Sequence, residues 1–187
     1  EHIPAKHRQL IKAFLDEADM SADVIKTVDF PTPYGADIVV SCEKEKDTKN
    51  GSIYLKPTQF VLGIGCRRDT AFENIDRAIR QSLLKLQIDI SDIDMIASID
   101  VKKDEPGIKE FCDRNRIEFV TYTADELMAV QGEFSASQFV REHVGVDNVC
   151  ERAAVLACSR ECNKAGELIY KKHKYDSVTV AAARYPD

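Results

Sequence analysis

The stretch "FVLGIGCRRDTAFENIDRAIRQSLLKL" (residues 60–86) decides the fold that we predict. Its short apolar start is typical of a buried strand, which we place at residues 60–64. Its second half repeats apolar residues every three or four positions, as on one face of a helix, which we place at residues 71–86. Two glycines, a cysteine and two adjacent arginines therefore lie on a strand-to-helix turn, "GIGCRRDT" (residues 63–70).

The predicted helix has an apolar face and a charged face. The apolar face carries Phe72, Ile75, Ile79, Leu83 and Leu86. On the charged face, Glu73 precedes Arg77 by four residues, and Asp76 precedes Arg80 by four residues. Because residues four apart are neighbours on a helix, we expect both to form ion pairs.

The same strand–helix order continues along the chain. We predict strands at residues 95–100 and 118–123, with a helix that begins at Pro106 between them. The chain closes with two strand-like runs, 167–172 and 177–184, that flank a turn and indicate a hairpin. We therefore predict an α/β fold, a three-layer α/β/α domain with a mixed, partly parallel sheet.

Several four-residue patterns mark predicted helix starts. A Ser or Thr followed three residues later by Glu or Gln is a capping box. The chain has three such boxes and one variant with Asn: Thr70-x-x-Glu73, Thr123-x-x-Glu126, Ser135-x-x-Gln138 and Asn148-x-x-Glu151. We therefore expect three short helices between residues 124 and 160.

The first 57 residues differ from the rest. An amphipathic stripe over residues 6–18 predicts a helix, and short strands are predicted at 37–42 and 52–55. We interpret residues 1–57 as a short α+β segment, part of a central or linker region, and residues 58–187 as the main α/β domain.

The composition is that of a globular protein. The chain has 187 residues, of which 44% are hydrophobic and 31% charged, and its net charge is −6. This acidity argues against a nucleic-acid partner, which requires a broad basic face. No apolar run approaches the roughly 18 residues of a membrane span, and the amino end has no apolar signal core. We expect a cytoplasmic protein without a membrane partner.

The cysteine spacing predicts reduced thiols. The six cysteines are Cys42, Cys66, Cys112, Cys150, Cys158 and Cys162. A structural zinc site needs two close Cys pairs or a pair of histidines, and only Cys158 and Cys162 stand close together. We therefore expect no metal site.

The turn at residues 63–70 has the features of an anion site. Ligands of open α/β sheets bind beyond the carboxyl ends of the strands, where a helix start offers free N–H groups. Arg67 and Arg68 can each hold a carboxylate or phosphate through two parallel hydrogen bonds. The turn lacks the Gly-Lys-Ser/Thr ending of a phosphate-binding loop and the third glycine of a dinucleotide site. The alternative is that both arginines are solvated or paired with surface acids.

The second predicted strand also ends in a charged loop, residues 98–107. If the two strands are parallel, this loop lies beside the arginine turn. Its carboxylates and amines then line one cleft with the turn, a mixture that suits general acid/base work on an anionic substrate. These groups belong to Asp100, Lys102, Lys103, Asp104 and Glu105. The alternative is that Asp104 or Glu105 caps the helix that follows.

Two further features carry weaker signals. Glu151 completes its own helix cap or faces the cleft. The basic run of residues 171–174 is a solvated hairpin tip or part of an anion-binding rim.

Five stretches resemble the carboxy-terminal domain of the cobalamin-biosynthesis protein CbiG. They are "LGIGCRRDT", "ASIDVKKDEPGI", "FVTYTADEL", "HVGVDNVCERAAVLA" and "KYDSVTVAAARY", which occur in the family's order over about residues 60–184. Residues 1–57 resemble the end of the family's central segment, so we expect its amino-terminal domain to lie outside this chain.

The resemblance implies a function. The family is described as cobalt-precorrin-5A hydrolase of the anaerobic pathway, which opens a lactone on the macrocycle and releases acetaldehyde. The implied substrate is a cobalt corrinoid with many acetate and propionate groups. The resemblance implies no cofactor, because the cobalt arrives in the substrate.

The resemblance also marks residues of this chain. These residues lie in the two motifs that match the family, and their roles are our own inference from the chemistry. We expect substrate binding at Gly63, Gly65, Cys66, Arg67, Arg68, Thr70 and Lys102, and catalysis at Glu105 and Asp100. Asp69 replaces a glycine of many relatives, which makes the turn less permissive and places an acid beside the arginines. Lys103 replaces an alanine and is interpreted as a surface change.

Two other functions stay open. The domain can be a non-catalytic corrinoid-binding module whose chemistry depends on the amino-terminal domain, as the related stand-alone protein CobE suggests. It can also be a generic phosphate-binding α/β protein. Expected protein partners are a second copy of the chain, as a homodimer, or the amino-terminal domain.

Overall fold

The computed structural model describes residues 60–135, 145–162 and 164–185, together with three short strands before them. The chain divides into two compact units, residues 1–58 with Asp187, and residues 59–186. Each unit is described by itself.

The first unit contains a three-stranded sheet in the order β1-β2-β3. Its strands are β1 (Phe30–Pro31), β2 (Asp37–Val40) and β3 (Ile53–Leu55). β2 is antiparallel to β1 and parallel to β3. The strands predicted at 37–42 and 52–55 are confirmed within these bounds, whereas the helix predicted over 6–18 lies outside the described residues.

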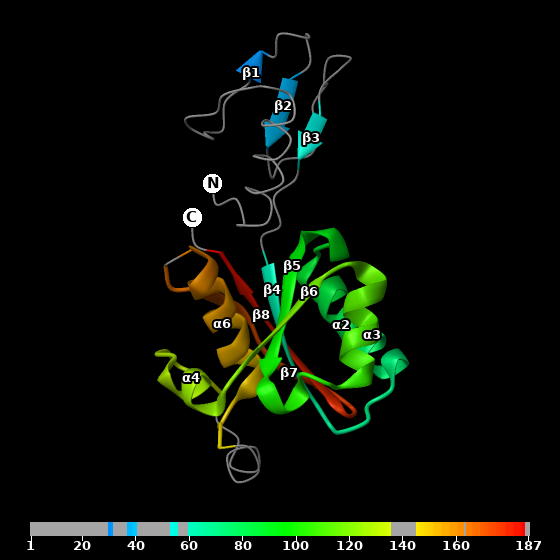
Figure 1. Ribbon diagram of the computed structural model, residues 1–187, viewed down its shortest axis with the longest axis vertical. Helices are drawn as coiled ribbons and strands as arrows, with labels where there is room; N and C mark the ends of the chain where they lie inside the picture. Colours follow the sequence, from blue (N-terminus) through cyan, green and yellow to red (C-terminus); the bar gives the residue numbers. More distant parts are fainter. Residues whose placement is uncertain are drawn as a thin grey trace. The chain divides into compact units, whose positions relative to one another are not determined.

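The second unit is built on a five-stranded sheet in the order β6-β5-β4-β8-β7 (Figure 1). Its strands are β4 (Phe60–Cys66), β5 (Ile93–Ile99), β6 (Glu118–Tyr122), β7 (Glu167–Tyr175) and β8 (Val178–Arg184). β4, β5 and β6 are parallel, whereas β8 is antiparallel to β4 and β7 is antiparallel to β8. The mixed, partly parallel sheet is therefore confirmed.

Helices cover both faces of this sheet (Figure 1). α2 (Phe72–Leu86) and α3 (Pro106–Asn115) pack on one face, and α4 (Ala124–Ala129) and α6 (Val149–Cys162) on the other. Two short 3₁₀ helices, η1 (Ile90–Asp92) and η2 (Asp100–Lys102), flank β5. The predicted three-layer α/β/α arrangement is thus confirmed.

The apolar face of α2 packs as the periodicity predicts. Ile75, Ile79 and Leu83 are buried, and Phe72 and Leu86 lie partly buried at the ends of the stripe. They share one core with residues of α3 and the sheet, namely Ile108, Phe111, Leu62, Ile64 and Ile96.

The opposite face of the sheet lets a helix come very close. A Cβ atom on Gly63 would overlap the carbonyl oxygen of Cys150, so α6 rests directly on the backbone of β4. Ala153, Ala154 and Ala157 are fully buried on α6, and their small size permits this approach. The first glycine of the "GIGCRRDT" motif is thereby explained by helix–sheet packing.

Two of the predicted helix starts are confirmed and one is wrong. Thr123 and Glu126 form a reciprocal capping box on α4. The Asn148 side chain accepts a hydrogen bond from the Glu151 backbone N–H at 3.0 Å and caps α6. Thr70 caps no helix, because α2 begins at Phe72 after an uncapped Ala71, and the Thr70 hydroxyl donates to the Arg67 carbonyl at 2.7 Å.

The remaining predicted start, at Ser135, involves Gln138, which lies outside the described residues. Of the three short helices expected between 124 and 160, the structure describes α4 and α6.

The hairpin is confirmed, but its first strand is longer than predicted. β7 continues to Tyr175, so the basic run 171–174 lies in an edge strand and not in the turn. The chain reverses at Asp176, which takes a left-handed backbone with φ of 43°. Aspartate tolerates this region better than most residues, which suits it to a tight turn.

Candidate functional site

The arginine turn lies at the carboxyl end of β4, between two neighbouring strands. The Arg67 backbone N–H donates to the Ser177 carbonyl at 3.0 Å, which ties the turn to the β7–β8 hairpin. Asp69 takes a left-handed backbone with φ of 58°. Glycine adopts this left-handed conformation readily, which explains why it also suits position 69. Aspartate is among the other residues that tolerate the conformation. The turn is therefore compatible with Asp69.

The arginine turn carries two exposed guanidinium groups that have no partner among the described residues. Arg67 and Arg68 are exposed, and neither side chain has an ion pair or hydrogen bond within the part of the chain that the structure describes. Five other arginines of that part are paired with carboxylates: Arg80, Arg114, Arg152, Arg160 and Arg184. The alternative that Asp69 or nearby surface acids neutralise the turn is therefore wrong for the described residues.

The arginine turn and the second charged loop lie side by side, as predicted. β4 and β5 are parallel neighbours. The Thr70 backbone N–H donates to Glu105 Oε1 at 3.0 Å. A Cβ atom on Gly107 would overlap the Thr70 carbonyl oxygen, so the start of α3 touches the arginine turn. Gly107 is thus needed for the contact between the two loops.

Glu105 acts as a clamp between these loops. Its other oxygen, Oε2, accepts a hydrogen bond from Lys102 Nζ at 2.7 Å. The residue is only 6% exposed, and both carboxylate oxygens are engaged. Glu105 stands at the N-cap position of α3 but makes no side-chain cap, so the alternative that it caps this helix is wrong. Asp104 makes only a distant ion pair, 3.9 Å from Lys109.

Cys66 lies beside this clamp. Burial raises the pKa of its thiol to about 11, and the nearby Lys102 ammonium only partly opposes that shift. A thiol with so high a pKa stays protonated at neutral pH and is a poor nucleophile. This argues against Cys66 as a nucleophile, and its expected role in substrate binding stays a prediction.

Asp100 lies in the same loop as Glu105. It begins η2 at the carboxyl end of β5 and is partly exposed. Among the described residues its side chain has no hydrogen bond or ion pair. Lys103, two residues before Glu105, is exposed, as expected of a surface change.

Two motif residues hold the strands in place beneath the site. Ser98 is fully buried, and its hydroxyl donates to the Ile64 carbonyl at 2.7 Å. Gly65 accepts a hydrogen bond from the Thr179 hydroxyl at 3.2 Å, and a Cβ atom there would lie 2.7 Å from the same oxygen. Both positions are explained by contacts within the sheet.

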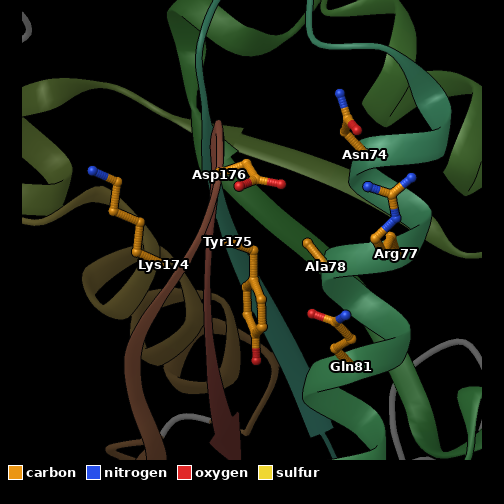
Figure 2. A pocket seen from close by; sticks show the side chains of 7 residues that line it. All are labelled: Asn74, Arg77, Ala78, Gln81, Lys174, Tyr175 and Asp176. Carbon is orange, nitrogen blue, oxygen red and sulfur yellow. The ribbon is translucent and has the colours of Figure 1, made fainter.

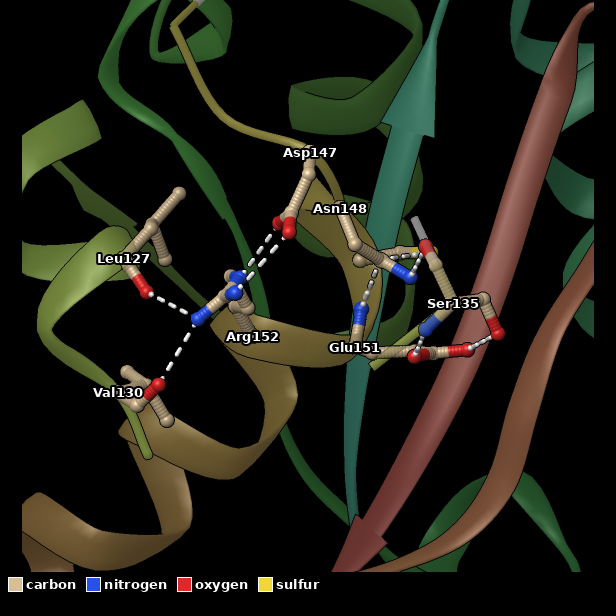
Figure 3. A network of polar contacts seen from close by, with 8 residues as sticks. Leu127, Val130, Ser135, Asp147, Asn148, Glu151 and Arg152 are labelled. Atoms are coloured by element: carbon tan, nitrogen blue, oxygen red, sulfur yellow. Dashed lines mark hydrogen bonds and ion pairs between the residues drawn. The ribbon is translucent and has the colours of Figure 1, made fainter. Parts of the chain in front are cut away.

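A buried carboxylate, Glu151, lies at the start of α6 (Figure 3). It accepts hydrogen bonds from the Ser135 backbone N–H and hydroxyl, each at 2.8 Å, and from the Lys172 backbone N–H at 2.6 Å. Burial opposes the charge on Glu151, but these hydrogen bonds outweigh it and hold its pKa below the usual value. Glu151 thus joins α6 to the edge strand β7 and does not complete its own cap.

Arg152 makes the neighbouring network (Figure 3). It pairs with Asp147 at 2.7 Å and donates to the carbonyls of Val130, at 2.8 Å, and Leu127, at 3.3 Å. It therefore fixes the end of α4 against α6. Nothing in the sequence indicated the contacts that Asn148 and Glu151 make with Ser135 and Lys172, because these partners are distant in the chain.

The described residues offer no group of three or more His, Cys, Asp or Glu side chains that could hold a metal ion. Four cysteines, Cys66, Cys112, Cys150 and Cys158, are described, and each is free of a disulfide. No helix in the described ranges is long and apolar enough to cross a membrane.

Comparison with known proteins identifies the second unit. Residues 60–183 match the model of the family described as Cobalamin synthesis G C-terminus. The chain is 34% identical over 126 residues to the cobalt-precorrin-5A hydrolase of Salmonella typhimurium, and 31% identical over 144 residues to that of Priestia megaterium. These alignments cover 67% and 77% of this chain, but only 34% and 37% of those proteins. The chain thus spans about a third of the length of these curated relatives.

A solved structure shares the fold. The crystal structure of CobE, a protein from the cobalamin (vitamin B12) biosynthetic pathway, superposes with a TM-score of 0.64 at 25% sequence identity. The match covers 69% of this chain and 92% of the CobE chain. The α/β unit therefore accounts for nearly all of that protein.

Proposed function

Because the chain belongs to the family of the Cobalamin synthesis G C-terminus, we propose that it acts in cobalamin biosynthesis as the carboxy-terminal part of a cobalt-precorrin-5A hydrolase. The observation that carries this proposal is the pair of exposed arginines at the carboxyl edge of the sheet, which have no partner among the described residues. A corrinoid bears several carboxylates, and an arginine without an internal partner can bind one through two parallel hydrogen bonds.

The site also offers groups for opening a lactone. Asp100 is the base in this proposal, because among the described residues its carboxylate has no partner, whereas both oxygens of Glu105 are engaged. Asp100 takes a proton from water as the water oxygen bonds to the lactone carbonyl carbon. The ring C–O bond then breaks, and the leaving oxygen receives that proton.

Charge develops on the carbonyl oxygen in this step. Arg67 and Arg68, on the turn before α2, can stabilise that charge in this proposal. The carbon–carbon cleavage that releases acetaldehyde is a separate, later step of the family's reaction. Glu105 joins the two loops through Thr70 and is itself held by Lys102. It thereby fixes the position of the arginine turn relative to the loop that carries Asp100.

A second function is favoured by the comparisons. The chain spans about a third of its curated relatives, and its α/β unit covers 92% of the CobE chain. It can therefore be a corrinoid-binding module whose chemistry depends on residues outside this chain.

Turnover separates the two functions. The chain and a full-length relative, such as the Salmonella typhimurium protein, are incubated with cobalt-precorrin-5A, and acetaldehyde is measured. Acetaldehyde from this chain, abolished by Asp100→Asn, supports the catalytic proposal. Binding of the corrinoid without acetaldehyde, while the relative turns it over, supports the binding module. Absence of both binding and turnover would refute both.

A further inference from the structure

A pocket opens between α2 and the tip of the β7–β8 hairpin (Figure 2). Its volume is about 220 Å³, and it is lined by Asn74, Arg77, Ala78, Gln81, Lys174, Tyr175 and Asp176. Pockets for drug-sized ligands have roughly 300–1,000 Å³. This pocket is therefore too small for a macrocycle, but it has room for one of its side arms.

The pocket adjoins the arginine turn. Asp176 precedes Ser177, whose carbonyl accepts the Arg67 backbone N–H at 3.0 Å. Asn74 lies in the first turn of α2, directly after that turn. A ligand held by Arg67 and Arg68 can thus reach the pocket with a peripheral group.

Arg77 faces this pocket without the partner that the sequence predicted. The ion pair expected between Asp76 and Arg80 is confirmed at 2.8 Å. The one expected between Glu73 and Arg77 is wrong, because among the described residues the Arg77 side chain has no ion pair or hydrogen bond. Among the described residues, Arg77 is therefore a third arginine without a partner, on the helix that follows the arginine turn.

The remaining lining groups define the ligand chemistry. Asn74 and Gln81 contribute amides, and neither has a side-chain hydrogen bond within the described residues. Figure 2 shows the Asp176 carboxylate opposite the Arg77 guanidinium, although the two make no ion pair in the described structure. The exposed Lys174 ammonium points away, but its flexible stem can bring it to the rim.

The hairpin wall of the pocket is fixed. The Tyr175 hydroxyl lies 3.1 Å from the Ser82 hydroxyl on α2 and 2.9 Å from the Tyr170 hydroxyl. Since the Ser82 hydroxyl also lies 2.9 Å from the Ala78 carbonyl, this chain of hydroxyls joins the hairpin to α2. The pocket is therefore pre-formed on this side.

We propose that this pocket is a second anion subsite, in which Arg77 binds a carboxylate-bearing side arm of the ligand. The identity of the whole ligand, a polycarboxylate macrocycle, rests on the proposed function. The preference of this pocket for a carboxylate is inferred from Arg77 and the residues around it. Asp176 occupies a turn position that needs a left-handed backbone, and its charge weakens the subsite. The subsite therefore acts as an additional anchor beside Arg67 and Arg68, and not as an independent strong site.

The test uses two small probes of the same shape. Propionate and the neutral propionamide are titrated, at tens of millimolar, into the isotopically labelled protein, and backbone amide shifts are followed by NMR. Propionate is expected to shift the amides of residues 74–81 and 174–177, and propionamide is not. Absence of shifts with propionate, or equal shifts with both probes, would overturn the subsite.

Charge variants sharpen the test. Arg77→Gln should abolish the propionate response, whereas Arg80→Gln, one turn along the same helix, should retain it because Arg80 is paired with Asp76. Asp176→Asn keeps a residue that tolerates the turn and removes the opposing charge, so it should tighten propionate binding about two- to fivefold. Weaker binding in Asp176→Asn would contradict a carboxylate ligand.

A cobalt corrinoid with free carboxylates links the subsite to the proposed function. Arg77→Gln should weaken its binding about tenfold, and Arg80→Gln should leave it unchanged. If the wild type shows the propionate response but binds no corrinoid, the subsite stands and the proposed function falls. If the wild type and both variants bind the corrinoid equally well, and the wild type shows no propionate response, the proposed function stands and the subsite falls.

Discussion

Replacement of Glu105 tests whether the clamp holds the two site loops. Glu105→Ala removes the acceptor of the Thr70 N–H and the partner of the Lys102 ammonium. The side chains of Glu105 and Lys102 are only 4% and 14% exposed, so both lost contacts are largely shielded from water.

The cost follows from this burial. Breaking a buried ion pair by removing one partner costs about 3–5 kcal/mol, and we take the lower end because the Lys102 stem can carry its ammonium toward water. In a chain of this size, about 3 kcal/mol corresponds to a melting temperature lower by roughly 6–12 °C. Glu105→Gln keeps the acceptor for Thr70 and should cost about half as much.

Thermal unfolding followed by circular dichroism measures this effect. Asp104→Asn serves as the control, because Asp104 is 77% exposed and its contact with Lys109 is 3.9 Å long. A Glu105→Ala protein that melts within about 2 °C of that control would refute the clamp. Unchanged melting with lost acetaldehyde release in Glu105→Gln would instead make Glu105 the catalytic base.

Other residues of the site and its support give further predictions. Gly63→Ala should destabilise the protein by more than about 3 kcal/mol or prevent folding, because the new Cβ atom overlaps the backbone of α6. In Gly65→Ala the new Cβ atom meets only the Thr179 hydroxyl, so the loss of stability should be smaller. Urea unfolding of both variants compares the two losses. Burial raises the pKa of Cys66 to about 11 and that of Cys150 to about 12, so in the native protein at pH 8 both should react with a thiol reagent far more slowly than in urea. Because the unfolded state loses these thiol protons first, the free energy of unfolding should fall as the pH rises from about 9 to 11, and an increase over that range would contradict the buried thiols. Six free thiols are expected in the denatured, unreduced chain, and a lower count would show a disulfide.

The layers of the fold were predictable because they depend on local periodicity. The apolar stripe of α2 and the alternation of strands with helices decide which faces are buried, independently of the conformation of the loops. The closeness of the arginine turn to the second loop also followed, since parallel neighbouring strands end at the same edge.

Two of the wrong details, at Thr70 and Glu151, involve competition from distant residues. Thr70 matches a capping box, but its backbone N–H binds Glu105, 35 residues away, and its hydroxyl binds Arg67. Glu151 likewise binds Ser135 and Lys172 and not its own helix start. Helix spacing alone contains none of these partners.

The pocket beside the arginine turn gave no signal in the sequence. Arg77 and Asp176 come together only because α2 packs against the β7–β8 hairpin. The spacing of Glu73 and Arg77 indicated an ion pair, whereas the fold turns Arg77 toward the hairpin.

Corrinoid binding by the arginine variants tests the central claim most directly. A cobalt corrinoid with free carboxylates is titrated, at low and high salt, into the wild type, Arg67→Ala and Arg68→Ala, with Arg80→Ala as the control. Each lost charge-assisted contact should cost about 1.5–3 kcal/mol, or roughly ten- to a hundredfold in affinity, and replacement by lysine should restore only part of it. Added salt should weaken the wild type more than either variant. Affinities that are equal in all four proteins, at both salt concentrations, would contradict the assignment of this turn as the carboxylate-binding site.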